Sequence, residues 1–254
     1  MNGKVGTYEF QVEPFHTDVT GRLSLPFLGN HLLNVAGRHA SERGFGMATV
    51  QQDHYTWVLS RLVIEMPENL PAQYEPFHVE TWVESVYRQF TDRSFMVTDQ
   101  NGRPCAYARS VWAMISQSGR LPLDLSLLHG DGIKEYVLER ECPIKKFSHV
   151  VAKDWILECS RKVQYSDIDV NGHVNSIQYM THVLDLFPLD FFRQKRLSRF
   201  EIGYAQEAFY GQTLDYFLDK TPDMLENAYQ VDIREHESGQ SICRGKVFFA
   251  ELNH

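Results

Sequence analysis

The sequence predicts an α+β fold built from two tandem repeats, each with one long helix laid across an antiparallel sheet. Three observations predict it: a polar turn motif that occurs twice, an amphipathic helix after each motif, and a run of strand-like segments after each helix. The chain has 254 residues, of which 43% are hydrophobic. It is therefore long and apolar enough to bury a substantial core.

The turn motif appears once in each half of the chain. DVTGRLS (18–24) aligns with DVNGHVN (169–175), and the Asp, Val and Gly positions are identical. Gly21 and Gly172 are kept in both copies, as a tight turn before a helix requires.

An amphipathic helix is expected directly after each turn, because apolar residues recur there at helical spacing. The first copy also has Pro26, which suits the first turn of a helix. The apolar face consists of Phe27, Leu28, Leu32, Val35 and Ala36 in the first copy, and of Val174, Ile177, Met180, Val183, Leu184 and Phe187 in the second.

Strand-like runs follow each helix, and turn residues at 99–104 and 235–240 join the last two runs of each copy as hairpins. The runs cover 55–66, 77–87, 93–99 and 106–116 in the first copy, and 198–204, 213–219, 228–235 and 241–252 in the second. A sheet of this kind buries one face under a helix. The layout is that of a double hotdog, with repeats at 1–118 and 159–254 and a linker at 119–158 that is poor in periodicity.

Composition excludes several classes of protein. The net charge of −8 argues against a nucleic-acid binder, which needs a basic surface. No run approaches the roughly 18 apolar residues of a membrane span. The four cysteines are scattered without metal-ligand spacing, which fits a reducing cytoplasm.

A calcium loop is the first alternative for the second turn, because Asp167, Asp169, Asn171 and Gly172 read D-x-D-x-N-G. Such a loop needs a bidentate Glu at its twelfth position. That position is Gln178, so we expect no metal here.

The two turns differ in their polar residues, and this difference points to one working site. The second copy has Asn171 and His173 where the first has Thr20 and Arg22. Asp169, Asn171 and His173 can emerge on one side of the segment, next to a helix N-terminus that favours negative charge. Such a group could orient water and move protons at an acyl carbonyl. Helix capping with a surface histidine remains the alternative.

Three segments of the chain resemble the acyl-acyl-carrier-protein thioesterases, the plant and bacterial fatty-acyl thioesterase family. They are SDIDVNGHVNSIQYMTHVLD (166–185), EIGYAQEAFYGQTL (201–214) and ARSVWAMISQSGRL (108–121). The resemblance implies a double hotdog that hydrolyses a thioester without a cofactor. It also implies a catalytic second repeat with Asp169, Asn171, His173 and Glu207, and a first repeat that binds substrate without this polar set.

Two positions depart from the family pattern. Ala208 follows Glu207 where the family often has Cys, and Gly172 stands where it often has Gln. If the chain is active, a cysteine is dispensable. Whether Glu207 acts as nucleophile or as general base stays open.

The resemblance implies a fatty-acyl chain carried on the phosphopantetheine of acyl carrier protein. Trp57, Val58 and Trp82 are candidates for lining an acyl tunnel, although core packing explains them equally well. A basic stretch is a candidate docking patch for the acidic carrier or, alternatively, a solvated helix end; it consists of Arg193, Lys195, Arg196 and Arg199. A homodimer through exposed sheet edges is possible. The bacterial type is expected in the cytoplasm, because the sequence starts directly on its first repeat.

Three other functions remain as alternatives. An acyl-CoA thioesterase would use the same chemistry with another carrier. A hotdog hydratase or dehydratase usually has G-D-x-N-P, and here Gly172 follows Asn171 in place of Pro. A non-catalytic acyl-binding module would leave unexplained why only one copy keeps the polar residues.

Overall fold

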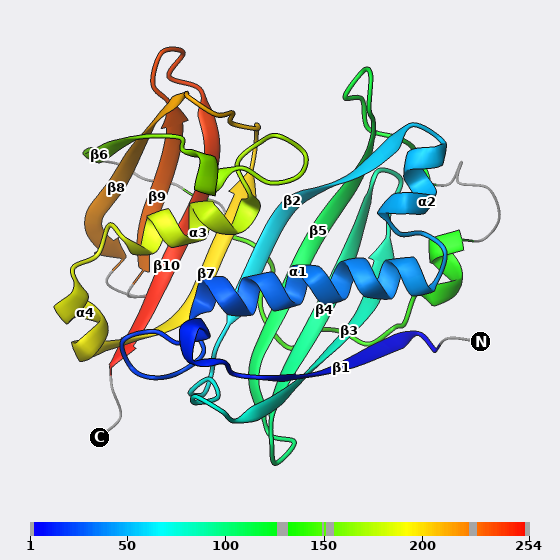
Figure 1. The fold of residues 1–254 in the computed structure, drawn as a ribbon, viewed down its shortest axis with the longest axis horizontal. Coiled ribbons are helices and arrows are strands. Elements are labelled where there is room, and N and C mark those ends of the chain that lie inside the picture. Colours follow the sequence, from blue (N-terminus) through cyan, green and yellow to red (C-terminus); the bar gives the residue numbers. More distant parts are fainter. Residues whose placement is uncertain (1–2, 126–131, 149, 151–154, 224–227, 252–254) are drawn as a thin grey trace. The chain divides into compact units, whose positions relative to one another are not determined.

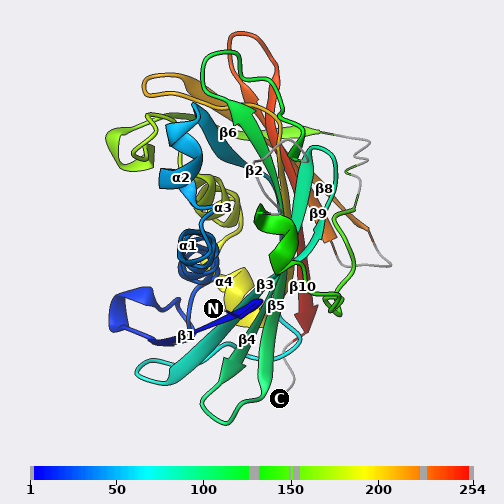
Figure 2. The same ribbon diagram turned by 90° about the vertical axis from the view of Figure 1, so that its right-hand side faces the viewer.

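The computed structural model describes residues 3–125, 132–148, 150, 155–223 and 228–251. The chain divides into two compact units, Met1–Lys146 and Phe147–His254, and the division falls inside the expected linker. Within the described residues, each unit holds one antiparallel sheet and a helix that lies along one of its faces (Figures 1 and 2). Each unit therefore has the hotdog arrangement that the sequence predicts.

Unit 1 contains the long helix α1 (Leu25–Glu42) and the short helix α2 (Met47–Gln52). Its strands run in the order β1-β3-β4-β5-β2, all paired antiparallel. They are β1 (Val5–Gln11), β2 (Tyr55–Glu65), β3 (Pro76–Val86), β4 (Phe90–Asp99) and β5 (Pro104–Ser116).

Helix α1 is held by the apolar face that the spacing predicts. Leu28, Leu32 and Val35 are completely buried, and burial of each such side chain contributes about 1.5–3 kcal/mol. Phe27 is the exception, because it is only half-buried and stacks on the His16 ring at 4.3 Å.

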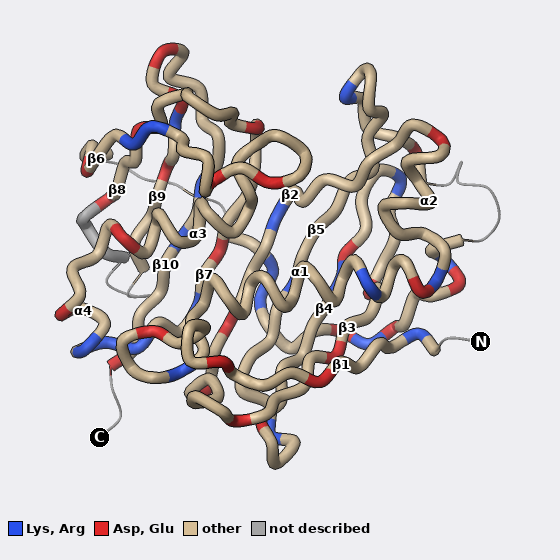
Figure 3. Tube along the Cα trace, viewed as in Figure 1, with Lys and Arg blue, Asp and Glu red and all other residues tan. Residues whose placement is uncertain are grey.

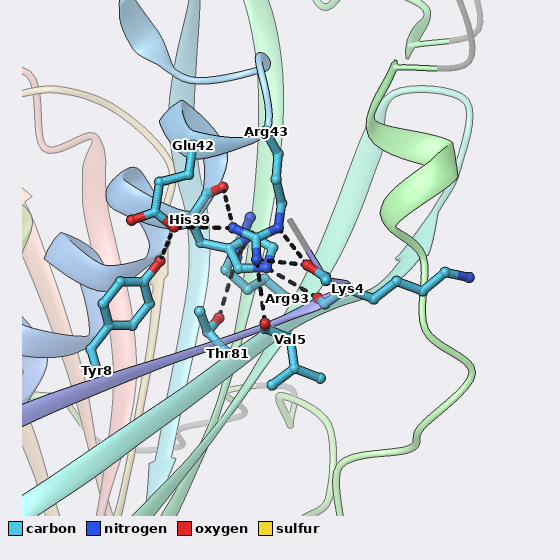
Figure 4. A network of polar contacts seen from close by, with 9 residues as sticks. Lys4, Val5, Tyr8, His39, Glu42, Arg43, Thr81 and Arg93 are labelled. Atoms are coloured by element: carbon cyan, nitrogen blue, oxygen red, sulfur yellow. Dashed lines mark hydrogen bonds and ion pairs between the residues drawn. The ribbon is translucent and has the colours of Figure 1, made fainter. Parts of the chain in front are cut away.

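A buried polar network ties the C-terminal part of α1 to the sheet (Figure 4). Arg93 donates to His39 Nδ1 at 3.0 Å and to Thr81 Oγ1 at 3.2 Å. Since a guanidinium has no acceptor, the His39 proton lies on Nε2, which donates to Lys4 O at 3.1 Å. Arg43 donates to Gly3 O at 2.6 Å. The network therefore fastens the edge strand β1 to α1.

Residues 140–142 of the predicted linker contact the other face of the unit 1 sheet. Thr81 points toward α1, so its neighbour Trp82 points to the opposite face. There the Trp82 indole donates to Arg140 O at 2.7 Å, and the Arg140 guanidinium lies 4.3 Å from the indole ring. Arg109 joins Glu84 at 2.8 Å and donates to Cys142 O.

Unit 2 contains helices α3 (Ser176–Leu184) and α4 (Leu189–Gln194). Its strands run in the order β7-β10-β9-β8-β6, again antiparallel. They are β6 (Ile156–Lys162), β7 (Lys195–Tyr204), β8 (Thr213–Asp223), β9 (Ala228–Glu235) and β10 (Ser241–Glu251).

Helix α3 is shorter than the predicted apolar face. Ile177, Met180 and Val183 are buried on it, but the helix ends at Leu184. Phe187 lies beyond the helix and packs against aromatic rings such as that of Phe249, at 5.1 Å. Pro188 disfavours a helical conformation at the residue before it, which explains the end of the helix before α4.

Candidate active site

The second turn motif folds into a tight loop between a 3-10 turn (Tyr165–Asp167) and α3. We call residues 169–173 the reactive turn. The Asp169 N–H donates to His173 O and the Gly172 N–H donates to Asp169 O, both at 3.0 Å. Gly172 has φ +83°, a left-handed conformation that glycine adopts without a steric cost. The glycine of the motif is therefore explained by the backbone.

Four side chains meet at this turn, and they are the four that the sequence singled out. His173 lies between two carboxylates, with Nδ1 3.7 Å from Asp169 Oδ1 and Nε2 3.4 Å from Glu207 Oε1. The side chains of Asp169, His173 and Glu207 are 21%, 24% and 29% exposed, so water and substrate can reach all three. Asn171 is exposed, and its Nδ2 lies 3.4 Å from Asp169 Oδ2.

Glu207 reaches the turn because its segment is hydrogen-bonded alongside it. The Val174 N–H donates to Ala208 O at 2.8 Å, and His173 forms a β-bridge with Phe209. Glu207 lies just after β7, so the start of the β7–β8 connection brings this carboxylate to the imidazole.

The start of α3 leaves one backbone donor unpaired among the described residues, next to the reactive turn in the sequence. Asn175 caps the helix, since its Oδ1 accepts from the Ile177 N–H at 2.8 Å. Asn175 O accepts from the Gln178 N–H at 2.9 Å. Among the described residues, the Ser176 N–H has no such partner, and the N-terminus of a helix favours negative charge there.

Unit 1 contains a backbone replica of the reactive turn. The Asp18 N–H donates to Arg22 O at 2.9 Å, and the Gly21 N–H donates to Asp18 O at 3.0 Å. Gly21 has φ +74°. The Leu23 N–H donates to Pro71 O at 2.9 Å, as Val174 does to Ala208.

The replica lacks the chemistry of the reactive turn. Arg22 stands in the place of His173 and donates through Nη1 to Leu70 O at 2.9 Å. Leu70 stands in the place of Glu207, because each precedes the residue whose carbonyl accepts the bond from the turn. The sequence did not show that Leu70 corresponds to Glu207, because the segments around these two residues share no motif.

The three candidates for lining an acyl tunnel lie in unit 1. The Trp57 indole donates to Phe45 O at 2.9 Å and packs against the core residues Phe45 and Met114. Val58 is half-buried in β2. Trp82 lies on the sheet face that points away from α1, under Arg140, which argues against a lining position between α1 and the sheet.

The predicted docking patch is divided between α4 and β7 (Figure 3). Arg199 is only 8% exposed and its Nε lies 2.7 Å from Glu201 Oε1, so it is not available on the surface. Arg193 is exposed and pairs with Asp190 at 2.8 Å, and Lys195 lies 3.5 Å from Glu251. Arg196 is half-buried.

No group of three or more His, Cys, Asp and Glu side chains that could hold a metal ion is present in the described part of the chain. Gln178, the twelfth residue of the calcium-like stretch, donates its amide to Ser166 O at 3.1 Å. Among the described residues, none of the helices is long and apolar enough to cross a membrane.

Models of one protein family match both units. The acyl-ACP thioesterase N-terminal domain matches residues 3–126, and the C-terminal domain matches residues 152–251. Among solved structures, an acyl-ACP thioesterase from Bacteroides thetaiotaomicron is 49% identical, with a TM-score of 0.90 over 97% of this chain and 98% of that one. The 12:0-ACP thioesterase from Umbellularia californica is 18% identical, with a TM-score of 0.83 over 99% of both chains, and shows the common fold.

Curated plant relatives are more distant and longer. The chloroplastic oleoyl-acyl carrier protein thioesterase of Coriandrum sativum is 25% identical over 82% of this chain and 60% of its own length. The chloroplastic palmitoyl-acyl carrier protein thioesterase of Gossypium hirsutum is 24% identical over 97% of this chain. The chain spans about 60% and 64% of the lengths of these two relatives. With both family domains matched over most of its length, the chain belongs to the acyl-ACP thioesterase family.

Proposed function

We propose that this protein hydrolyses the thioester of fatty acyl-acyl carrier protein at the reactive turn of unit 2. The observation that carries the proposal is the imidazole of His173 between the carboxylates of Asp169 and Glu207, at the start of α3. The replica turn of unit 1 supports it, because the same backbone there has neither imidazole nor second carboxylate. Family membership supports the reaction class and the carrier.

The proposed reaction adds water to the thioester carbonyl carbon. In one form of the reaction, His173 takes a proton from the water, Glu207 and Asp169 stabilise the resulting imidazolium, and the water oxygen attacks to give a tetrahedral oxyanion. The Ser176 N–H and the α3 N-terminus stabilise this charge. The C–S bond then breaks, the proton passes through His173 to the departing sulfur, and a fatty acid and the carrier thiol are released. No cofactor is required.

The flanking carboxylates explain how one imidazole serves both steps. A neutral imidazole donates through one nitrogen, whereas an imidazolium donates through both. Asp169 faces Nδ1 and Glu207 faces Nε2, so both carboxylates stabilise the imidazolium that forms when His173 takes the proton. The separations of 3.7 and 3.4 Å are longer than hydrogen bonds, and such contacts often tighten when substrate binds.

Attack by Glu207 itself is the second form of the reaction. It would give an acyl-enzyme anhydride that water then hydrolyses. Single-turnover hydrolysis in ¹⁸O water distinguishes the two forms. Direct attack by water places label in the fatty acid only, whereas attack of water on the glutamyl carbonyl of the anhydride leaves the label in the Glu207 carboxylate.

The test of the proposal is thiol release from acyl-acyl carrier proteins, with matched acyl-CoAs measured alongside. His173→Ala and Glu207→Ala should lower kcat by roughly 10²- to 10⁴-fold, as expected for the loss of a positioned acid–base group. Arg22→Ala changes the matching position of unit 1 and should leave kcat nearly unchanged.

Other outcomes of the same assay decide between the alternatives. Faster release from acyl-CoA would keep the mechanism and change the carrier. If neither substrate releases thiol, the hydrolase proposal is wrong. Full activity of both variants would show that neither His173 nor Glu207 takes part in the reaction.

A further inference from the structure

A series of largely buried polar contacts lies next to the reactive turn, outside the four proposed catalytic residues. The Tyr216 hydroxyl lies 2.7 Å from His182 Nδ1, and His182 Nε2 lies 3.3 Å from Asp167 Oδ1. Tyr216 is completely buried, and the side chains of His182 and Asp167 are 14% and 9% exposed. These residues connect β8 and α3 to the segment that enters the reactive turn.

Asp167 is hydrogen-bonded both to the residues before the reactive turn and to the start of α3 after it. Its carboxylate accepts from the Gln164 N–H at 2.7 Å, and its backbone carbonyl accepts from the Asn175 N–H at 2.8 Å. Asn175 is the N-cap of α3. One residue therefore fixes the chain before the reactive turn and the helix start after it.

The proton positions in this series of contacts follow from burial. Burial raises the pKa of the Tyr216 phenol, which keeps its proton and donates to His182 Nδ1. Burial is also the largest influence on His182, and it lowers the pKa of this imidazole although Asp167 opposes the shift. A neutral imidazole that accepts at Nδ1 must donate from Nε2. The Tyr216 hydroxyl therefore donates to His182, and His182 donates toward the Asp167 carboxylate.

Unit 1 shows that the turn folds without such a series of polar contacts. Ser24 N–H donates to His16 O at 2.9 Å, so His16 occupies the place of Asp167. His31 follows Ser24 at the same spacing at which His182 follows Asn175. The rings of His16 and His31 lie 5.9 Å apart, and His16 Nδ1 is buried without a hydrogen-bond partner among the described residues. The same backbone turn therefore forms without a carboxylate beneath it.

We propose that Asp167 and His182 are positioning residues for the reaction at His173. The inference rests on the proposed function. Together they fix the start of α3, and with it the reactive turn, relative to Glu207. Unit 2, which has the His173 imidazole and the second carboxylate, also has the polar contacts between Tyr216, His182 and Asp167. The replica in unit 1 has His16 and His31 at the positions of Asp167 and His182. Geometry of this kind matters because a misplacement of about 1 Å can cost roughly 100-fold in rate.

The experiment compares Asp167→Asn, His182→Leu and His182→Gln with the matched control His31→Leu in α1. Asp167→Asn and His182→Leu should lower kcat by about 10- to 100-fold, the range that a displaced catalytic group produces, while KM changes less than about two-fold. His182→Gln can still donate to Asp167 and should recover part of the loss. His31→Leu should leave kcat within about two-fold.

A readout without turnover separates this inference from the proposed function. NMR signals of the His173 ring and the Asn175 amide should move in Asp167→Asn and His182→Leu and stay in place in His31→Leu. If the unmodified protein releases no thiol, the proposed function fails, and the NMR result still decides whether the series of contacts positions the turn. Unchanged kcat in an active protein, or unmoved NMR signals, would overturn the positioning role. Equal losses of kcat in His182→Leu and His31→Leu would overturn it as well.

Discussion

Single side chains in unit 2 carry polar atoms that the corresponding residues of unit 1 lack. Tyr179 follows the cap residue Asn175 at the same spacing at which Leu28 follows Ser24. The Tyr179 hydroxyl lies near the Ala208 amide but makes no hydrogen bond with the described residues, although the side chain is only 2% exposed. Burial raises its pKa, so the phenol stays neutral. Unit 2 thus contains a buried tyrosine hydroxyl at a position where unit 1 has a leucine.

Tyr179→Phe should leave stability unchanged or raise it by about 1 kcal/mol, because an unpaired buried hydroxyl costs about 1–3 kcal/mol. Tyr204→Phe is the matched control. The Tyr204 hydroxyl donates to Ser176 O at 3.0 Å, and its loss should destabilise the protein by about 1 kcal/mol. Urea unfolding measures both changes. A clear loss of stability in Tyr179→Phe would mean that its hydroxyl is paired after all.

The four residues that the sequence singled out lie together in the structure, whereas the surroundings of other predicted site residues differ from the expectation. Asp169, Asn171 and His173 stand close together in one motif, and the structure brings them to Glu207. The burial of Arg199 could not be predicted, because its partner Glu201 lies two positions away on the same strand and reads as an ordinary surface charge. Trp82 was also ambiguous, since a buried tryptophan looks the same in sequence whichever face of the sheet it occupies.

The helices show how similar elements are stabilised differently in the two units. Helix α1 has 18 residues and begins without a side-chain cap at Ser24, whereas α3 has nine residues and is capped by Asn175. A short helix depends more on its ends, because it has few interior hydrogen bonds. The cap of α3 is therefore a larger part of its stability.

Asn175→Ala should destabilise the protein by about 1 kcal/mol, the usual loss for an N-cap whose side chain accepts a backbone hydrogen bond. Ser24→Ala should cost much less, since the Ser24 side chain makes no cap bond. Thermal and urea unfolding of the two variants provide the comparison. Equal losses would show that capping does not distinguish the two helices.

Element boundaries were the weakest part of the sequence prediction. The apolar spacing continues to Phe187, but the helix stops at Leu184 and the phenylalanine joins an aromatic cluster instead. The six residues of α4 are too few to show periodicity, so the sequence indicated this helix only through the alternative interpretation of the basic stretch as a helix end. Arg193 does lie in the last turn of α4, but β7 begins inside the basic stretch at Lys195.

At the scale of the whole chain, the duplication was the most informative feature of the sequence. Aligning two turns within one chain predicted two helix-on-sheet units and identified the polar residues that differ between them. The alignment could not identify Leu70 as the residue that corresponds to Glu207, because this correspondence depends on the backbone hydrogen bonds to Pro71 and Ala208.

The buried network of Figure 4 makes the stability of the whole chain sensitive to acid. Burial, followed by the nearby Arg93 and Arg43, lowers the pKa of His39 from 6.5 to about 3. Between these values the unfolded chain binds a proton that the folded chain does not. The contribution of His39 to stability is therefore complete above pH 6.5 and is lost as the pH falls toward 3.

His39→Gln should remove this dependence, so stability should fall less steeply between pH 6.5 and 5 than in the unmodified protein. One group of this kind contributes a slope of up to about 1.4 kcal/mol per pH unit. Urea unfolding at several pH values measures the slope. His31 and His182 also have lowered pKa values, but they are present in both proteins and cancel in the comparison. Parallel pH profiles would show that His39 does not titrate with unfolding.

The replica turn of unit 1 gives protein design a starting point. Asp18 and Gly21 already form the backbone turn that Asp169 and Gly172 form in unit 2. Three substitutions, Thr20→Asn, Arg22→His and Leu70→Glu, would install the missing side chains at the matching positions. The internal repeat therefore provides a second turn with the same backbone hydrogen bonds, on which the proposed set of side chains can be assembled within one chain.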